Sequence, residues 1–280
     1  SLFIRPAVIL KGKKGGFYKT LSRFSNQIAF SVDWKSTAND VLQVANPFNV
    51  EISDSSVFGL NRSFRNTFFF NQNSSVFALN VNTIRTGGKI LSNNGFEYRS
   101  TTVNEIVTRL KLSKSLLLEG KTGLGLKEQN NEFFSVKNFE ITSFNIEPKI
   151  SYQPGKKTRF TLFYTLTEKD NKLEFGGQNS INNTLGGVIR YSEAGKSHIE
   201  TSISYSEIGF SDTDGEIVNN TSPIAYEMLQ GLASGKNYIW SLNYQKTIRE
   251  NTQLSILYNG RKTEITDVVH SAGAEIRIFF

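Results

Sequence analysis

Apolar and polar side chains alternate without a break over the last ten residues of the chain, from Ser271 to Phe280. A period of two is the period of a β-strand, in which successive side chains point to opposite faces of a sheet. One face of this segment is wholly apolar, and the other carries Glu275 and Arg277. The alternation therefore predicts a strand with one apolar and one polar face.

The same alternation recurs along the rest of the chain. Segments of strand length are separated by polar stretches rich in Gly, Asn and Ser, which are typical of turns and loops. We therefore expect an all-β protein that forms a single domain over residues 1–280. The other predicted strands fall at 2–10, 28–35, 64–71, 76–84, 106–113, 116–127, 144–152, 159–166, 185–191, 199–206, 238–245 and 254–259.

The connections between these segments alternate between short and long. Transmembrane β-barrels of the bacterial outer membrane have short periplasmic turns and longer extracellular loops, whereas a soluble β-sandwich has no reason to sort its loops in this way. The pattern favours a barrel whose last strand runs toward the periplasm. The short connections fall near 72–74, 113–115, 153–157, 193–196 and 250–251, and the long ones at 37–62, 85–102, 128–140, 167–183 and 211–237.

The composition agrees with this interpretation. The chain contains no run of about 18 apolar residues, which a spanning helix would need. Its mean hydropathy is −0.31, and its content of aromatic residues is 12%. Half of each barrel strand faces a polar lumen, and aromatic girdles mark the two membrane interfaces. Because such barrels usually have even strand numbers, we expect an antiparallel up-and-down transmembrane barrel of about fourteen strands.

The end of the chain resembles the closing strand of a bacterial outer-membrane barrel. Such strands carry a terminal signal for the barrel-insertion machinery, and the resemblance places that signal here at Ser271, Gly273, Ile276, Ile278 and Phe280. The alternative is the final edge strand of a soluble sandwich, against which the sorted loops argue.

Several segments resemble the C-terminal region of large uncharacterised outer-membrane proteins of the Bacteroidota. This resemblance implies a multi-pass protein of a Gram-negative outer membrane, and a chain that is the C-terminal part of a longer one. It supplies no catalytic residues. The segments that carry it are 46–49, 63–71, 226–232, 235–240, 258–262 and the Phe-Phe end.

Candidate chemistry is sparse. The chain has two histidines, His198 and His270, and no cysteine, which excludes thiolate metal sites and disulfides. His270 with Asp267 would form an acid/base pair at the rim, but no nucleophile accompanies them, so an interfacial histidine is the simpler interpretation. The segment 211–216 begins like a calcium loop but lacks its later ligands. We expect no catalytic residues, no cofactor and no metal.

One segment in the longest loop has helical spacing. Tyr226, Leu229 and Leu232 would share one face of a short helix. This face would serve as a docking element for a partner or as a plug, or the helix would simply cover the barrel rim, and both interpretations remain open.

Many charged residues fall on the face of the strands that is predicted to line the lumen. On lipid, each Arg or Lys would cost about 2–4 kcal/mol near the membrane midplane. The lumen is either closed by salt bridges or forms a pore that mildly disfavours cations. The residues are Glu119, Lys121, Glu147, Lys149, Arg159, Arg190, Glu200, Arg249, Arg261, Glu275 and Arg277.

Three functions follow from these observations. The first is a non-enzymatic membrane anchor and subunit of an outer-membrane protein complex, in assembly or secretion. The second is a porin-like channel for small solutes, and the third an outer-membrane hydrolase, which the scarcity of histidine disfavours. Expected partners are outer-membrane lipid and lipopolysaccharide, the barrel-insertion machinery, and other outer-membrane or periplasmic proteins. Nucleic acid is not expected, because the net charge of +7 is scattered along the chain.

The terminal strand yields a first prediction. Ile278→Asp and Phe280→Asp each place a carboxylate on the lipid face of this strand, and we expect both to prevent insertion, as judged by loss of heat-modifiable mobility in gel electrophoresis. Glu275→Gln, on the opposite face, should insert normally. Normal insertion of both aspartate variants would contradict the proposed role of the C-terminus.

Overall fold

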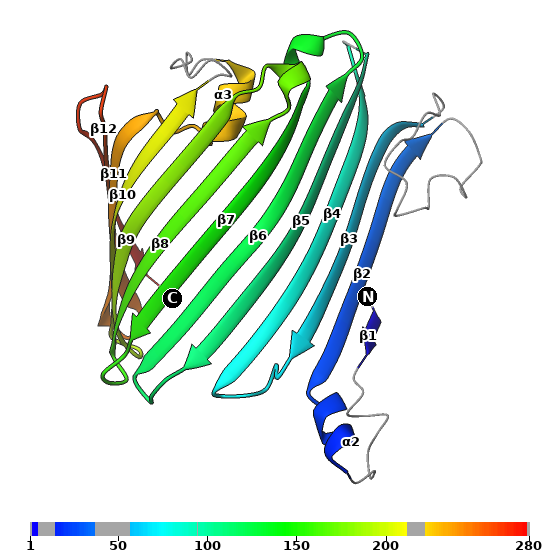
Figure 1. Cartoon of the computed structure of the whole chain (residues 1–280). Helices are drawn as coiled ribbons and strands as arrows, with labels where there is room; N and C mark the ends of the chain where they lie inside the picture. Colours follow the sequence, from blue (N-terminus) through cyan, green and yellow to red (C-terminus); the bar gives the residue numbers. More distant parts are fainter. Residues whose placement is uncertain (1, 5–14, 37–56, 94, 212–221, 279–280) are drawn as a thin grey trace.

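One antiparallel sheet contains all the strands of the structure, a computed structural model that describes residues 2–4, 15–36, 57–93, 95–211 and 222–278. Neighbours in the chain are neighbours in the sheet throughout (Figure 1). The strands are β1 (Leu2–Ile4), β2 (Phe24–Ser36), β3 (Val57–Phe70), β4 (Phe77–Ser92), β5 (Gly95–Lys111), β6 (Leu116–Asn131), β7 (Phe139–Tyr152), β8 (Thr158–Asn171), β9 (Asn179–Glu193), β10 (Ser197–Ser211), β11 (Gly235–Arg249), β12 (Thr252–Thr263) and β13 (Val269–Ile278).

Each predicted strand overlaps an observed strand, so the all-β, up-and-down antiparallel fold is confirmed. The expectation of about fourteen strands is wrong. In the part of the chain that the structure describes, the sheet has twelve long strands, β2–β13, and the three-residue β1. The sequence contains thirteen alternating segments, and a fourteenth strand was expected only because such barrels usually have even strand numbers. Residues 5–10, which we expected to continue the first strand, lie outside the described residues.

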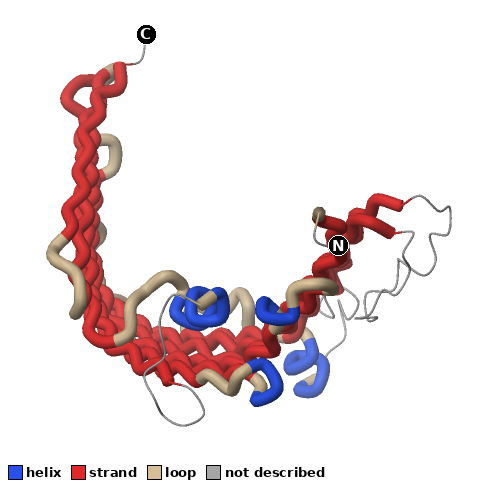
Figure 2. The backbone as a smooth tube through the Cα atoms, turned by 90° about the horizontal axis from the view of Figure 1, so that it is seen from above, coloured by secondary structure: helices blue, strands red, loops and turns tan. Residues whose placement is uncertain are grey.

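The sheet curves strongly but is open in the part of the chain that the structure describes. Among the described residues β13 pairs only with β12, and β1 only with β2. Figure 2 shows the two edges far apart, one at each end of the curve. The expected closed barrel is therefore not observed, because no hydrogen-bonded ladder joins the first and last strands.

Register places the predicted lumen charges on one face, with the exception of Arg249, which lies opposite Thr252 after a register shift and so falls on the side of Ile278. Arg109 lies opposite Glu119, Glu119 opposite Lys149, and Arg159 opposite Arg190. Residues directly opposite each other in an antiparallel pair point to the same side. This side is the concave one, because the helix α3 (Pro223–Leu229) packs on it inside the curve (Figure 2). The polar face of the strands thus lines the hollow of the sheet.

The convex face carries the large apolar and aromatic side chains over β6–β9. Leu124, Ile146, Leu162 and Leu185 are all well exposed there, as expected of a surface that faces lipid. The two tryptophans also point outward, Trp34 on β2 and Trp240 on β11.

A polar patch interrupts this apolar surface on β2–β5. Asn26 donates a hydrogen bond to Asn66 (2.7 Å), and Thr83 donates one to Asn104 (3.0 Å). Arg85 lies two residues from Thr83 on the same face and is exposed. We call these five residues the convex polar patch.

Most of the connections follow the expected sorting, with one clear error. The short turns and the longer loops lie at opposite ends of the sheet (Figure 1). The long connection predicted at 85–102 does not exist, because β4 and β5 run through it and only residues 93 and 94 join them. Polar side chains and the pair Gly87-Gly88 resemble a loop in sequence, but here they belong to strands that continue past the apolar band. The helix α2 (Gly16–Leu21) and two short helices, η1 (Ser135–Lys137) and η2 (Leu173–Phe175), complete the described elements.

Candidate functional site in the concave face

The helix α3 has strong local signals at both ends. The side chain of Ser222 accepts a hydrogen bond from the backbone N–H of Ala225 (3.0 Å), which is an N-cap, and Pro223 occupies the first turn. At the C-terminal end Gln230 adopts the left-handed conformation, with φ of 56°. These signals confine the helix to seven residues.

An apolar cluster holds α3 against the sheet. Ile224, Ala225, Met228 and Leu229 are buried, since they fall on one side of the helix. Burying one large apolar side chain stabilises a contact by about 1.5–3 kcal/mol, so several such side chains suffice to dock a short helix. The sheet contributes Phe139 and Ile141 from β7 and Ile208 and Phe210 from β10, and Leu232 packs against the same cluster.

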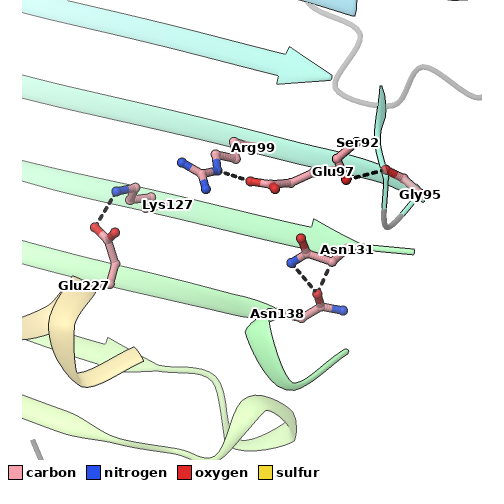
Figure 3. Close-up of polar contacts among 8 residues, drawn as sticks. All are labelled: Ser92, Gly95, Glu97, Arg99, Lys127, Asn131, Asn138 and Glu227. Atoms are coloured by element: carbon pink, nitrogen blue, oxygen red, sulfur yellow. Dashed lines mark hydrogen bonds and ion pairs between the residues drawn. The ribbon is translucent and has the colours of Figure 1, made fainter. Parts of the chain in front are cut away.

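Two lysines of the concave face contact the polar side of α3. Lys127 on β6 forms an ion pair with Glu227 (Figure 3). The Nζ atom of Lys169 on β8 donates to the carbonyl oxygen of Met228 (2.7 Å) and lies 3.4 Å from that of Glu227. A cation near the last carbonyls of a helix also interacts favourably with the helix dipole. The helix is thus fixed by both apolar and charged contacts.

A cavity of about 800 Å³ adjoins this helix on the concave face. Lys127 lines it and links it to α3, while Arg99 and Glu97 on β5 form an ion pair within it (Figure 3). Asp33, Asn61 and Ser63 contribute further polar groups from β2 and β3. The volume and the mixed lining would suit a small polar solute.

The end of β6 is stapled to the start of β7 beside this cavity. The side-chain oxygen of Asn138 accepts from the backbone N–H of Asn131 (2.7 Å) and from its side-chain amide (3.1 Å), as Figure 3 shows. These bonds fix the loop that carries η1 next to the apolar seat of α3. The loop between β6 and β7 is therefore closed by side-chain hydrogen bonds at its base.

Among the described residues no group of three or more His, Asp or Glu is placed to hold a metal ion. The residues of the calcium-like segment, Asp212, Asp214 and Glu216, lie outside the described part.

The structure separates the three residues that helical spacing grouped. Leu229 is buried and Leu232 packs beside it, but Tyr226 is 70% exposed on the opposite side of the helix. The packing face runs instead through Ile224, Ala225 and Met228, because the helix starts at Pro223. The short helix rests on the concave wall at the loop end of the sheet.

The two histidines lie far from α3. His270 is on the convex side, where its Nδ1 lies 2.8 Å from the Tyr258 hydroxyl and its ring stacks on that of Tyr258. Trp240 meets it edge-on. His270 is thus part of an aromatic cluster, and no contact with Asp267 is formed. His198 lies on the concave face, 3.8 Å from Glu200.

The terminal strand places its residues on the expected faces. Ile276 and Ile278 point outward and are 63% and 52% exposed, whereas Ser271, Gly273 and Glu275 belong to the concave side. Phe280 lies outside the described residues.

Sequence reasoning missed Lys127, Lys169 and Glu227 as a connected group. Glu227 lies 100 residues from Lys127 in the chain, so no local pattern signals their contact. The inward direction of Lys127 was apparent from the alternation, but its partner depends on how the longest loop folds back.

In the described part of the chain, no helix is long and apolar enough to cross a membrane. No protein-family model and no curated protein sequence matches the chain.

Comparison with solved structures shows the fold. The chain is similar to the siderophore receptor PirA from Pseudomonas aeruginosa, with 10% identity, a TM-score of 0.57, and coverage of 92% of this chain and 40% of the receptor. Weaker likeness extends to the ferric yersiniabactin uptake receptor FyuA from Yersinia pestis (8% identity, TM-score 0.48, 91% and 57% covered) and to OmpT, an outer membrane protein of Vibrio cholerae (8%, 0.43, 92% and 96%).

These structural neighbours are outer-membrane β-barrels. On its likeness to PirA the chain has the fold of an outer-membrane barrel wall, and it spans about two fifths of the length of PirA.

The docking of α3 leads to a second prediction. Ala225→Asp puts a carboxylate at a fully buried position, and we expect it to release the helix from the wall, so that backbone amides 224–232 exchange with deuterium about tenfold faster or more. Tyr226→Asp, one residue along but exposed, is the matched control and should exchange as the unaltered protein does. Equal exchange in both variants would show that the apolar cluster does not hold the helix.

Proposed function

We propose that this chain forms part of the wall of an outer-membrane barrel of the Bacteroidota type, and that it anchors and belongs to an outer-membrane protein complex. The barrel itself carries out no catalysis in this proposal. The complex serves a process such as assembly or secretion of other proteins. One observation favours a protein neighbour over lipid, namely the convex polar patch.

The patch is unsuited to lipid. An Arg on the lipid face of a barrel is costly, by up to about 2–4 kcal/mol at the midplane and less toward the interfaces, and the side chain of Arg85 is exposed on this face. The amide groups of Asn66 and Asn104 also keep hydrogen-bonding capacity beyond the single bonds that they form with Asn26 and Thr83. A protein surface that supplies acceptors would satisfy these groups, whereas acyl chains would not.

The rest of the convex face provides the contrast. Over β6–β9 the outward positions in the middle of the strands are mostly Leu, Ile and Phe. Thr122 and Asn183 are polar exceptions, and Asn183 accepts a hydrogen bond from the Tyr164 hydroxyl (2.7 Å). The two halves of one sheet thus differ in the neighbour that they suit. This supports lipid beside β6–β9 and a partner protein beside β2–β5.

A second candidate is a porin-like channel for small solutes. It is favoured by the polar concave face with its cavity of about 800 Å³ beside α3. Ion conductance of the purified protein in a planar bilayer would favour this channel, and its absence would favour the anchor.

The complex is tested with cysteine-directed photo-cross-linking, for which the natural chain offers a clean background because it contains no cysteine. Asn104→Cys places the probe in the convex polar patch, and Leu162→Cys places it on the lipid-like half of the same face. In native membranes we expect a protein adduct from the first and only lipid adducts from the second. Mass spectrometry then identifies the partner.

Two outcomes would contradict this proposal. Lipid adducts alone from both positions, together with purification of a lone chain in mild detergent, would contradict the complex. Activity of any kind that is lost in His270→Ala, with insertion intact, would contradict the absence of catalysis.

A further inference from the structure

A second cavity, of about 310 Å³, lies at the short-turn end of the sheet and is strongly basic. Arg109 and Lys111 line it from β5, Lys114 from the turn before β6, and Arg159 from β8. If the last strand runs inward, this end of the sheet is periplasmic. We call these four residues the basic cluster.

The three strand residues of the basic cluster point into the hollow of the sheet. Arg109 lies opposite Glu119 and Arg159 opposite Arg190, all on the concave side. Lys111 lies opposite Leu117, and Leu117 lies opposite Ser151, which also lines the cavity. A ligand would therefore approach through water, and lipid headgroups on the convex side would not reach it.

None of the four cations of the basic cluster has a carboxylate partner in the described part of the chain, whereas several other cations of the concave face do. Farther along the strands Lys121 pairs with Glu105 (2.6 Å), Lys149 with Glu147 (3.2 Å), and Arg190 with Glu200. No carboxylate that the structure describes forms an ion pair with any member of the basic cluster, and Glu119 forms none with Arg109 although it lies directly across from it.

At the same end of the sheet, two other lysines do have a carboxylate partner. Lys157 donates to Glu193 (2.8 Å), and this hydrogen bond raises the pKa of the Lys157 ammonium group. Lys196 lies 3.5 Å from the same carboxylate. A lysine at this end can therefore find a carboxylate partner, but the residues of the basic cluster do not.

Both guanidinium groups are held in place by neutral acceptors. Arg109 donates through Nη2 to the carbonyl oxygen of Ser74 (3.1 Å). Arg159 donates through Nε and Nη2 to the side-chain oxygen of Gln153 (3.3 and 2.9 Å). A guanidinium has five N–H donors in a fixed fork, so each keeps donors for an anion. Orientation is settled before a ligand arrives, which lowers the entropic cost of binding it.

We propose that the basic cluster is a binding site for a small solute that carries two or three negative charges on carboxylate or phosphate oxygens. Four neighbouring cations repel one another, and a multivalent oxyanion removes this repulsion while forming charge-assisted hydrogen bonds. The cavity volume matches a small metabolite and is too small for a folded partner. Three chain segments meet at this site, so an anion would also bridge β5 to β8 at the mouth of the hollow.

The experiment is calorimetric titration of the purified full chain in detergent with citrate as the probe, at constant ionic strength. We expect saturable binding at one site. Arg109→Gln combined with Lys111→Gln should weaken the affinity about tenfold or more, because two charge-assisted contacts are lost. The matched control is Lys121→Gln, which removes a cation of the same face that already has a partner, and it should stay within about twofold of the unaltered protein.

Lys114→Gln is a second variant, in an exposed turn where the substitution should not disturb folding. As a single substitution it should also weaken the affinity for citrate. Inorganic phosphate as the probe should compete with citrate for the same site. The proposal is overturned if citrate does not saturate, or if the double variant and Lys114→Gln both bind as tightly as Lys121→Gln.

Discussion

The antiparallel backbone ladder is the constraint on which the whole structure depends. In a bilayer an unpaired N–H or C=O group costs several kcal/mol, so each strand must be paired along its length. The ladder runs with almost no irregularity from β2 to β13, with register shifts only near the ends of β2 and β11. Because strand pairing fixes which side chains lie opposite each other, it also fixes which side chains form the concave face and which form the convex face. The helix seat, the cavities and the polar patch each belong to one of these two faces.

The two faces are used differently along the sheet. On the concave face the loop end carries an apolar seat for α3 and ion pairs that secure it, whereas the turn end carries cations without carboxylate partners. On the convex face the change runs across the strands, from the polar patch on β2–β5 to the apolar surface on β6–β9. On the concave face the chemical character thus changes along the length of the strands. On the convex face it changes from one strand to the next across the sheet.

Alternation made much of this predictable. The faces of Lys121, Lys149 and Arg190 followed from a period of two, and so did the outward direction of Ile276 and Ile278. The extent of β4 and β5 did not follow, since polar strand ends beyond the apolar band resemble loops in sequence. The contacts of Lys127 and Lys169 with α3 were also beyond reach, because they join segments that are far apart in the chain.

The sequence also could not show whether β1 and β13 pair with each other. Alternation reports the period of each strand and says nothing of the curvature of the sheet, so a closed ring and an open arc have the same sequence pattern. Whether the edges of an arc meet depends on the number of strands and on their stagger, which are properties of the whole assembly.

The positions of the two tryptophans have a consequence for spectroscopy. Trp34 lies on the second strand and Trp240 on the eleventh, so the tryptophan emission of this chain, excited selectively at the red edge of its absorption, originates near the two edges of the sheet. Trp240 is also close to Tyr258 and His270, whereas Trp34 belongs to the other arm of the curve. The emission spectrum therefore sums a signal from each side of the sheet. Replacing either tryptophan would show which part of the spectrum comes from which side.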